Sequence, residues 1–236
     1  MPQPTIVFDL DGTLIDSAPD LIDTLNFVLM NEGVMPFPFE QARALVGFGA
    51  RRLIQDSFDA RGHAYTATDI ERMFESYVAH YADRIAKLSR PFPGLENAIE
   101  VLQTHGCRLA VCTYKLEWLA VKLLDELGLS RHFSAICGQD SFGIAKPTPD
   151  ILRRTVAKAG GEPGCAVMIG DSATDIRTAQ AAAIPVVFVD FGYSDATEAT
   201  LGPDRTISHF DALPEAVFAL LPQIPGREGA LIGNLR

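Results

Sequence analysis

The chain has 236 residues, of which 47% are hydrophobic and 21% charged, as expected for a soluble globular protein with one large domain or one domain carrying an insertion. Its net charge of -10 argues against broad binding to nucleic acids or anionic membranes, and the absence of a secretory leader or an 18-residue apolar run predicts a cytoplasmic protein. The four cysteines form no C-x-x-C pair, so we expect buried thiols in a reducing compartment and no zinc site.

Short apolar runs alternate with amphipathic segments along most of the chain. Strands are expected at 5–9, 108–113, 135–137, 166–170 and 186–190, and helices near 95–105, 116–128, 149–160 and 173–183. Gly106, Gly128 and Gly160 lie at or just after three of these helices, where C-terminal glycines are common. Strands separated by helices of 10–15 residues predict an α/β fold with a doubly wound, Rossmann-like parallel sheet.

The segment 17–89 interrupts this alternation. It contains no clear buried strand, and apolar residues recur at helical spacing around 21–29 and 70–81. We therefore expect a helical cap at 17–89 inserted into an α/β core that comprises 1–16 and 90–236. The proline-rich segment 90–94 is a plausible linker, and the glycine- and proline-rich tail from Pro222 is expected to be frayed.

Polar residues follow the predicted strands where parallel sheets bind ligands, at their carboxyl ends. Asp9 and Asp11 follow the first strand at a spacing that can aim both carboxylates into one small volume, and Gly12 allows the chain to turn there. Thr113 ends the second strand, and Lys146 precedes the fourth.

The fourth strand is followed by Asp171 and Asp175, which brings the set to four carboxylates, one hydroxyl and one lysine. Clustered carboxylates repel each other and need a cation, and their hard oxygen atoms suit Mg²⁺. Asp171 could instead cap the following helix, although Ser172 competes for that position. Lys115 is expected to be a solvated residue at the start of a helix.

Four segments together resemble the motifs of the haloacid dehalogenase superfamily. They are DLDGTLIDS at 9–17, the T-x-K at 113–115, KPTPD at 146–150 and GDSATD at 170–175, and they occur in the order found in that superfamily. The resemblance covers nearly the whole chain, and the position of the insertion is similar to that of the superfamily's helical cap.

The resemblance implies a role for each matching residue. Asp9 resembles the nucleophile that becomes an aspartyl-phosphate, and Asp11 resembles the general acid and base. Thr113 and Lys146 resemble the phosphate-binding pair. The Mg²⁺ ligands would be Asp9, the main-chain carbonyl of Asp11, and Asp171, with Asp175 as a ligand or a supporting residue. An acid two residues after the nucleophile is typical of the phosphotransferases of this superfamily and not of its dehalogenases.

Within the superfamily, the segments 46–54 and 112–129 look most like phosphoglycolate phosphatases, which implies hydrolysis of a small phosphate monoester such as 2-phosphoglycolate. Tyr114 departs from the usual Thr-Asn-Lys pattern, as does Thr174 at a place often held by Asn, so substrate contacts at Tyr114 are in question. Gly47, Gly49 and Arg51 could form a loop and helix start that binds a substrate carboxylate.

Two alternatives remain open. A sugar-phosphate mutase would share the roles of Asp9 and Asp11, and a catalytically silent phosphate-binding protein would share the fold. The expected partner is a small phosphate monoester, with neither nucleic acid nor membrane bound, and the chain is expected to be a monomer or a homodimer.

Overall fold

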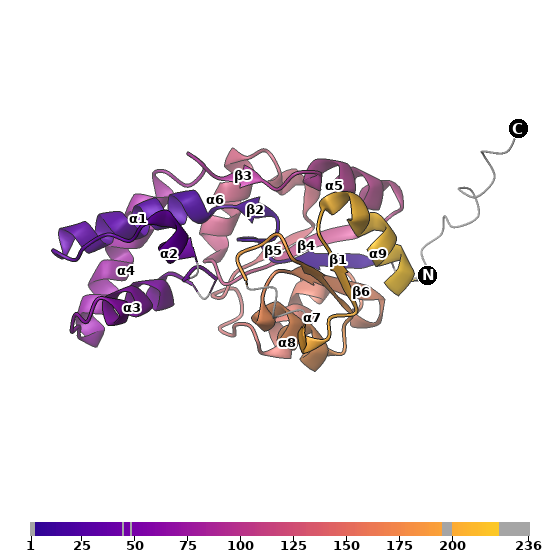
Figure 1. The fold of residues 1–236 in the computed structure, drawn as a ribbon. Coiled ribbons are helices and arrows are strands. Elements are labelled where there is room, and N and C mark those ends of the chain that lie inside the picture. Colours follow the sequence, from indigo (N-terminus) through magenta and orange to yellow (C-terminus); the bar gives the residue numbers. More distant parts are fainter. Residues whose placement is uncertain (1–2, 44, 48, 195–199, 222–236) are drawn as a thin grey trace, which may run out of the picture.

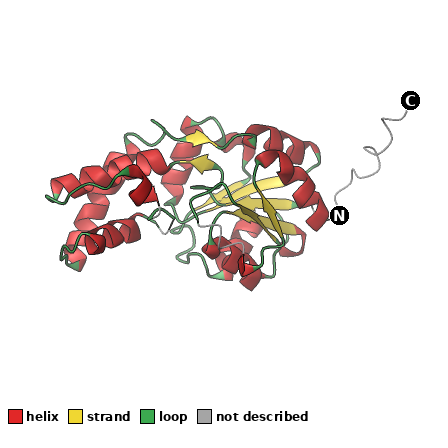
Figure 2. Ribbon diagram, viewed as in Figure 1, coloured by secondary structure: helices red, strands yellow, loops and turns green. Residues whose placement is uncertain are grey.

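The computed structural model describes residues 3–43, 45–47, 49–194 and 200–221. Its centre is a sheet with helices around it (Figure 2). The sheet has six parallel strands in the order β5-β4-β1-β6-β7-β8. The strands are β1 (Thr5–Phe8), β4 (Arg108–Cys112), β5 (Ala135–Cys137), β6 (Ala166–Gly170), β7 (Val186–Val189) and β8 (Arg205–Ile207). This order winds outward in both directions from β1, so the predicted doubly wound sheet is confirmed.

Helices cover both faces of the sheet because its strands are apolar on both sides. The helices α5 (Leu95–Thr104), α6 (Glu117–Glu126) and α9 (Leu213–Leu220) pack in one hydrophobic cluster, and α7 (Pro149–Lys158) and α8 (Ala173–Ala182) pack in the other (Figure 1). Short 3-10 turns occupy Ser130–His132, Pro163–Cys165 and Phe210–Ala212. All four cysteines are buried, as predicted.

The predicted elements match the core closely, with two omissions. The edge strand β8 was not predicted because it is short and only Ile207 of its three residues is buried. The helix α9 was also not predicted. The tail from Pro222, predicted to be frayed, lies outside the described residues.

The segment between β1 and β4 folds mainly as helices that lie beside the sheet (Figure 1). They are α1 (Ala18–Asn31), α2 (Phe39–Arg43), α3 (Ala50–Ala60) and α4 (Ala67–Ala82), and we call them the helical insertion. The residues with helical spacing, such as Leu25 in α1 and Tyr77 in α4, are buried where these helices pack together. No helix in the described part of the chain is both long and apolar enough to span a membrane.

The chain enters and leaves the helical insertion through a small antiparallel pair, β2 (Ile15–Asp16) and β3 (Arg90–Pro91). Beside this pair, the buried Asp20 carboxylate accepts hydrogen bonds from the backbone amides of Leu88 and Ser89 and from the Ser89 hydroxyl, at 2.7–3.1 Å. One side chain in α1 therefore fastens the returning chain to the start of the helical insertion.

Candidate active site

The sheet register brings distant residues to one edge. Asp9 continues β1, and its amide donates to the Ile169 carbonyl at 2.8 Å, so its backbone still belongs to the sheet pattern. Phe8 is aligned with Val111 of β4 and with Ile169 of β6. Thr113 and Asp171 therefore follow the neighbouring strands at nearly the same level as Asp9, as the strand-end argument predicted.

Three carboxylates gather at this edge. One oxygen each from Asp9, Asp171 and Asp175 lies within 4.8 Å of the others, and all three residues are buried. Oxygen donors from carboxylates are the ligands that Mg²⁺ and Ca²⁺ take in proteins. The arrangement can therefore hold a hard divalent cation.

Asp171 is fixed by the loop that follows Asp9 and by a second loop far along the chain. Its carboxylate accepts hydrogen bonds from the Thr13 hydroxyl at 2.9 Å and from the Tyr193 amide at 2.8 Å. Gly12 has a φ of 84°, and a Cβ atom there would lie 2.5 Å from the Asp171 carboxylate. Glycine at position 12 thus permits both the left-handed turn and the close approach.

Both carboxylate oxygens of Asp175 have partners. Ser172 is the N-cap of α8, and it forms a capping box with Asp175, whose carboxylate accepts from the Ser172 amide and hydroxyl. The other Asp175 oxygen lies 2.6 Å from Lys146 Nζ. Ser172, and not Asp171, therefore caps this helix, which leaves Asp171 available to a ligand.

Lys146 is a buried cation between two of these acids. Its Nζ lies 3.0 Å from Asp9 Oδ1 and 2.6 Å from Asp175 Oδ1. Burial alone would lower the pKa of Lys146, but Asp175 and Asp9 together raise it above the usual value. The contact with Asp9 lacks the angles of a hydrogen bond, so Asp9 Oδ1 is a buried oxygen without a hydrogen-bond partner.

The charges of this group do not balance. Three carboxylates and one lysine leave a formal charge of −2 in a buried place, since −3 + 1 = −2. Burial and the neighbouring carboxylates raise the pKa of Asp9 to about 8 and that of Asp171 to about 7. A divalent cation would neutralise the excess charge, and the Asp9 oxygen that lacks a hydrogen-bond partner fits a ligand role.

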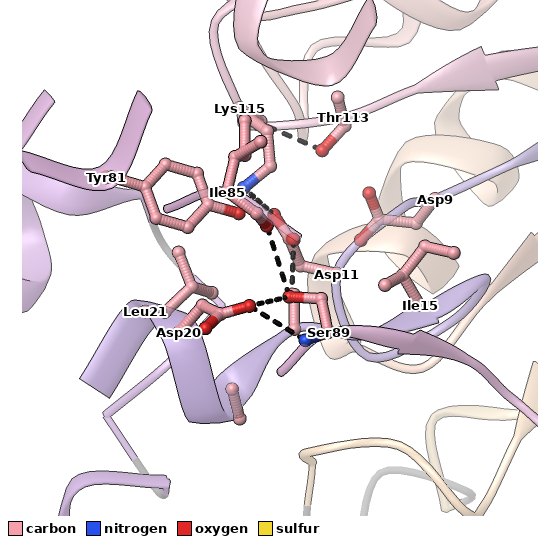
Figure 3. A network of polar contacts seen from close by, with 12 residues as sticks. Asp9, Asp11, Ile15, Asp20, Leu21, Tyr81, Ile85, Ser89, Thr113 and Lys115 are labelled. Carbon is pink, nitrogen blue, oxygen red and sulfur yellow. Dashed lines mark hydrogen bonds and ion pairs between the residues drawn. The ribbon is translucent and has the colours of Figure 1, made fainter. Parts of the chain in front are cut away.

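Asp11 lies beside this group but faces another way (Figure 3). Its carboxylate accepts from the Ser17 hydroxyl at 2.5 Å and lies 2.9 Å from Lys115 Nζ. Lys115 also donates to the Tyr81 hydroxyl at 3.1 Å. The prediction of a solvated Lys115 is therefore wrong: its side chain is only 5% exposed because it extends between Asp11 and the helical insertion.

A cavity of about 60 Å³ opens between the sheet edge and the helical insertion. Asp9, Asp11, Thr113 and Lys115 line it from the core. The core also contributes Tyr114, Leu116, Leu119 and Gln139. The segment between β2 and β3 contributes Leu21, Val46, Gly47, Gly49, Ala50, Leu53, Phe74, Tyr77, Val78 and Tyr81.

The candidate substrate residues separate into two sets. Gly47, Gly49 and Tyr114 line the cavity, and the Tyr114 hydroxyl donates to the Lys146 carbonyl. Arg51 does not line it. Its guanidinium forms two hydrogen bonds with Glu71, at 2.8 and 2.9 Å, and lies 3.5 Å from the centre of the Phe74 ring. The structure therefore gives no support to the idea that Arg51 binds a substrate carboxylate.

Three residues near the site were not predicted to belong to it. Tyr81 was interpreted as part of the helix core, Lys115 as a surface residue, and Tyr193 was not considered. The T-x-K pattern at 113–115 could have indicated that Lys115 belongs to the site. Thr113 is a site residue, and a lysine two residues later is close enough to the same strand end to reach the site.

Comparison with known proteins agrees with this geometry. A family model described as haloacid dehalogenase-like hydrolase matches residues 6–189. A phosphoglycolate phosphatase of Mesorhizobium japonicum is 46% identical over 90% of this chain and 94% of its own. One from Caulobacter vibrioides is 42% identical over 94% of this chain and 93% of its own. The crystal structure of a predicted phosphoglycolate phosphatase from Haemophilus somnus superposes with a TM-score of 0.84 at 27% identity, covering 90% of this chain and 97% of the other.

The chain belongs to the haloacid dehalogenase-like hydrolase family. The chain matches its relatives over more than nine-tenths of their length. It is therefore a phosphatase, a hydrolase of phosphoric monoesters.

Proposed function

We propose that this enzyme hydrolyses 2-phosphoglycolate to glycolate and phosphate, with Mg²⁺ as cofactor and Asp9 as covalent nucleophile. The observation that carries the proposal is the convergence of Asp9, Asp171, Asp175 and Lys146 in one buried group with a formal charge of −2. Such a group suits a divalent cation together with the phosphoryl group of a substrate.

Asp9 and Asp171 would hold the metal through their carboxylates, and the main-chain carbonyl of Asp11 would supply a third ligand. Asp175 has partners at both oxygens, which favours a supporting role in which it orients Lys146. Mg²⁺, when bound, would withdraw charge from a phosphoryl oxygen and reduce its repulsion by the Asp9 carboxylate.

The protein groups then perform two displacements at phosphorus. In the first, an Asp9 oxygen bonds to phosphorus while the ester oxygen leaves as glycolate, taking a proton from the Asp11 carboxyl. In the second, Asp11 takes a proton from water as that water attacks the aspartyl-phosphate, which releases phosphate and restores Asp9. Lys146 and the Thr113 hydroxyl would bind phosphoryl oxygens throughout.

A small substrate is supported by the cavity and by the relatives. The cavity of about 60 Å³ suits a small ligand, and several relatives are named phosphoglycolate phosphatase. Glycolate has five heavy atoms and is among the smallest leaving groups that also carry a charge.

The helical insertion at 17–89 would act as a cap over a catalytic core formed by 1–16 and 90–236. Phe74 and Tyr77 line the cavity opposite the sheet edge, so movement of the insertion would open and close the site. Closure would exclude bulk water from the aspartyl-phosphate until the leaving group has departed.

Phosphate release from 2-phosphoglycolate tests the proposal. We expect turnover that requires Mg²⁺, is lost in EDTA, and falls at least about 10³-fold in Asp9→Asn, because the amide is a poor nucleophile. Wild-type turnover by Asp9→Asn would contradict the mechanism. Isomerised sugar phosphate without free phosphate would instead indicate a mutase, and absence of any turnover would indicate a binding protein.

A further inference from the structure

Lys115 is a buried lysine that the proposed phosphoryl chemistry does not use. Lys115 follows the end of β4, and its side chain points toward Asp11 and toward Tyr81 of α4 (Figure 3). Two contacts hold Nζ in place: Asp11 Oδ2 at 2.9 Å and the Tyr81 hydroxyl at 3.1 Å. A lysine ammonium has three protons to donate, so one remains for a ligand in the cavity that Lys115 lines.

Among the residues that line this cavity, Lys115 is the one basic side chain. The other candidate cation, Arg51, is outside the cavity and is already paired with Glu71. A substrate with a second negative group would therefore meet Lys115 as the basic side chain of the cavity lining. Neutral leaving groups would leave this ammonium with its protein partners alone.

The position of Lys115 also matches the length of a two-carbon acid. The proposed general acid, Asp11, must reach the ester oxygen of the substrate, and the same carboxylate contacts Lys115. In phosphoglycolate a single methylene separates the ester oxygen from the carboxylate. An ester oxygen beside Asp11 therefore places the carboxylate within reach of Nζ, with the Tyr81 hydroxyl as a second donor.

We propose that Lys115 recognises the carboxylate of the substrate, and that Tyr81 of the helical insertion assists it. This inference rests on the proposed function and names the residue that selects a phosphorylated acid over a neutral phosphate ester. Because Tyr81 is in α4 and Lys115 follows β4, the carboxylate would contact both parts of the molecule at once.

The test compares two substrates that differ at one group. Phosphoglycolate carries a carboxylate where 2-hydroxyethyl phosphate carries an uncharged hydroxymethyl group. In Lys115→Met we expect kcat/KM for phosphoglycolate to fall about 10- to 100-fold further than the value for 2-hydroxyethyl phosphate, the range for a lost hydrogen bond to a charged group, because any loss that arises through Asp11 is common to both substrates. Inhibition by glycolate should weaken by a similar factor.

Arg51→Met serves as the matched control, because it removes the rival cation and should leave both substrates unaffected. Lys115→Arg keeps the charge and should retain part of the preference. An equal loss on both substrates in Lys115→Met would show that Lys115 only positions Asp11, and no loss on either would show that it has no role; each result overturns the inference. Turnover of 2-hydroxyethyl phosphate reports that the variant is folded.

The wild-type enzyme separates this inference from the proposed function. If the wild type does not prefer phosphoglycolate to 2-hydroxyethyl phosphate, the proposed substrate is wrong and the role of Lys115 is wrong with it. If the wild type has the preference and Lys115→Met keeps it, the inference about Lys115 alone is overturned.

Discussion

At the level of single residues, the buried acids of the site suit a bound cation, and their mutual repulsion destabilises the protein when no metal is bound. Asp9 and Asp171 are buried near Asp175, and Lys146 alone offsets their charge. The pKa values of Asp9 and Asp171 are raised for the same reason, because burial and neighbouring carboxylates make their charged forms unfavourable.

We therefore expect Asp171→Asn to stabilise the protein in EDTA at pH 8 while abolishing activity. The amide removes one buried negative charge and can still accept a hydrogen bond from Thr13 or from the Tyr193 amide. The gain should be on the order of 1 kcal/mol or more, since each unit by which burial raises the pKa of a carboxyl costs about 1.4 kcal/mol when the group is charged. Urea unfolding measures it, and a less stable variant in EDTA would contradict the account.

Sequence patterns located the acids but not their partners. Asp9, Thr113 and Asp171 could be predicted because each directly follows a strand, and the sheet order brings strand ends together. Lys146 lies in the loop between β5 and α7 and was predicted from the resemblance of KPTPD to a family motif. The surroundings of Lys115 could not be predicted, because its burial depends on Tyr81, which is 34 residues away in another part of the fold. Periodicity identified Tyr81 as a helix residue, but it could not show which group its hydroxyl contacts.

At the level of elements, the first turn of α8 connects helix stability to the site. The capping box between Ser172 and Asp175 satisfies amides at the helix start and also orients the carboxylate that binds Lys146. The helix α4 has the same device, formed by Thr66 and Asp69, far from the acids of the site and exposed.

This pair of caps allows a matched comparison. Ser172→Ala and Thr66→Ala should each lower the free energy of unfolding by about 1 kcal/mol, the usual cost of a lost N-cap. Only Ser172→Ala should also lower kcat, because Asp175 loses the Ser172 hydroxyl, one of the two donors that hold its carboxylate in position for Lys146. Thermal unfolding and phosphate-release kinetics on both variants measure this, and equal kcat values would contradict the positioning role of the cap.

The sequence predicted long or fully apolar elements better than short or exposed ones. The strands β1 and β6 are buried throughout, so their apolar runs were clear signals. The strand β8 has two exposed polar residues and is held by pairing with β7, a contact that no local pattern contains.

At the level of the whole molecule, the acidic group makes stability depend on pH. Asp9 and Asp171 have a usual pKa of 3.8 and raised values of about 8 and about 7 in the folded protein. The folded chain thus binds their protons more tightly than the unfolded chain. Their stabilising contribution is present at low pH and is lost as the pH rises from about 4 through about 8.

We expect the melting temperature in EDTA to fall between pH 6 and pH 8.5, and to fall less steeply in Asp171→Asn than in the wild type. Saturating Mg²⁺ binds the deprotonated acids, so its stabilising effect should grow over the same range. Differential scanning calorimetry with and without Mg²⁺ measures both effects. An identical pH dependence in the two proteins would show that these carboxylates are not its source.

Tyr193 connects the acids of the site to the start of the helical insertion. Its amide donates to Asp171, while its hydroxyl accepts from the amides of Ser17 and Ala18 at 2.6 and 2.8 Å, where α1 begins. Loading the acids with a cation should therefore slow hydrogen exchange at those two amides, because the Asp171 carboxylate that binds the cation also holds the Tyr193 loop. In Tyr193→Phe the two amides should exchange at the same rate with and without Mg²⁺. The start of α1 would then no longer respond to the binding of a cation at the site.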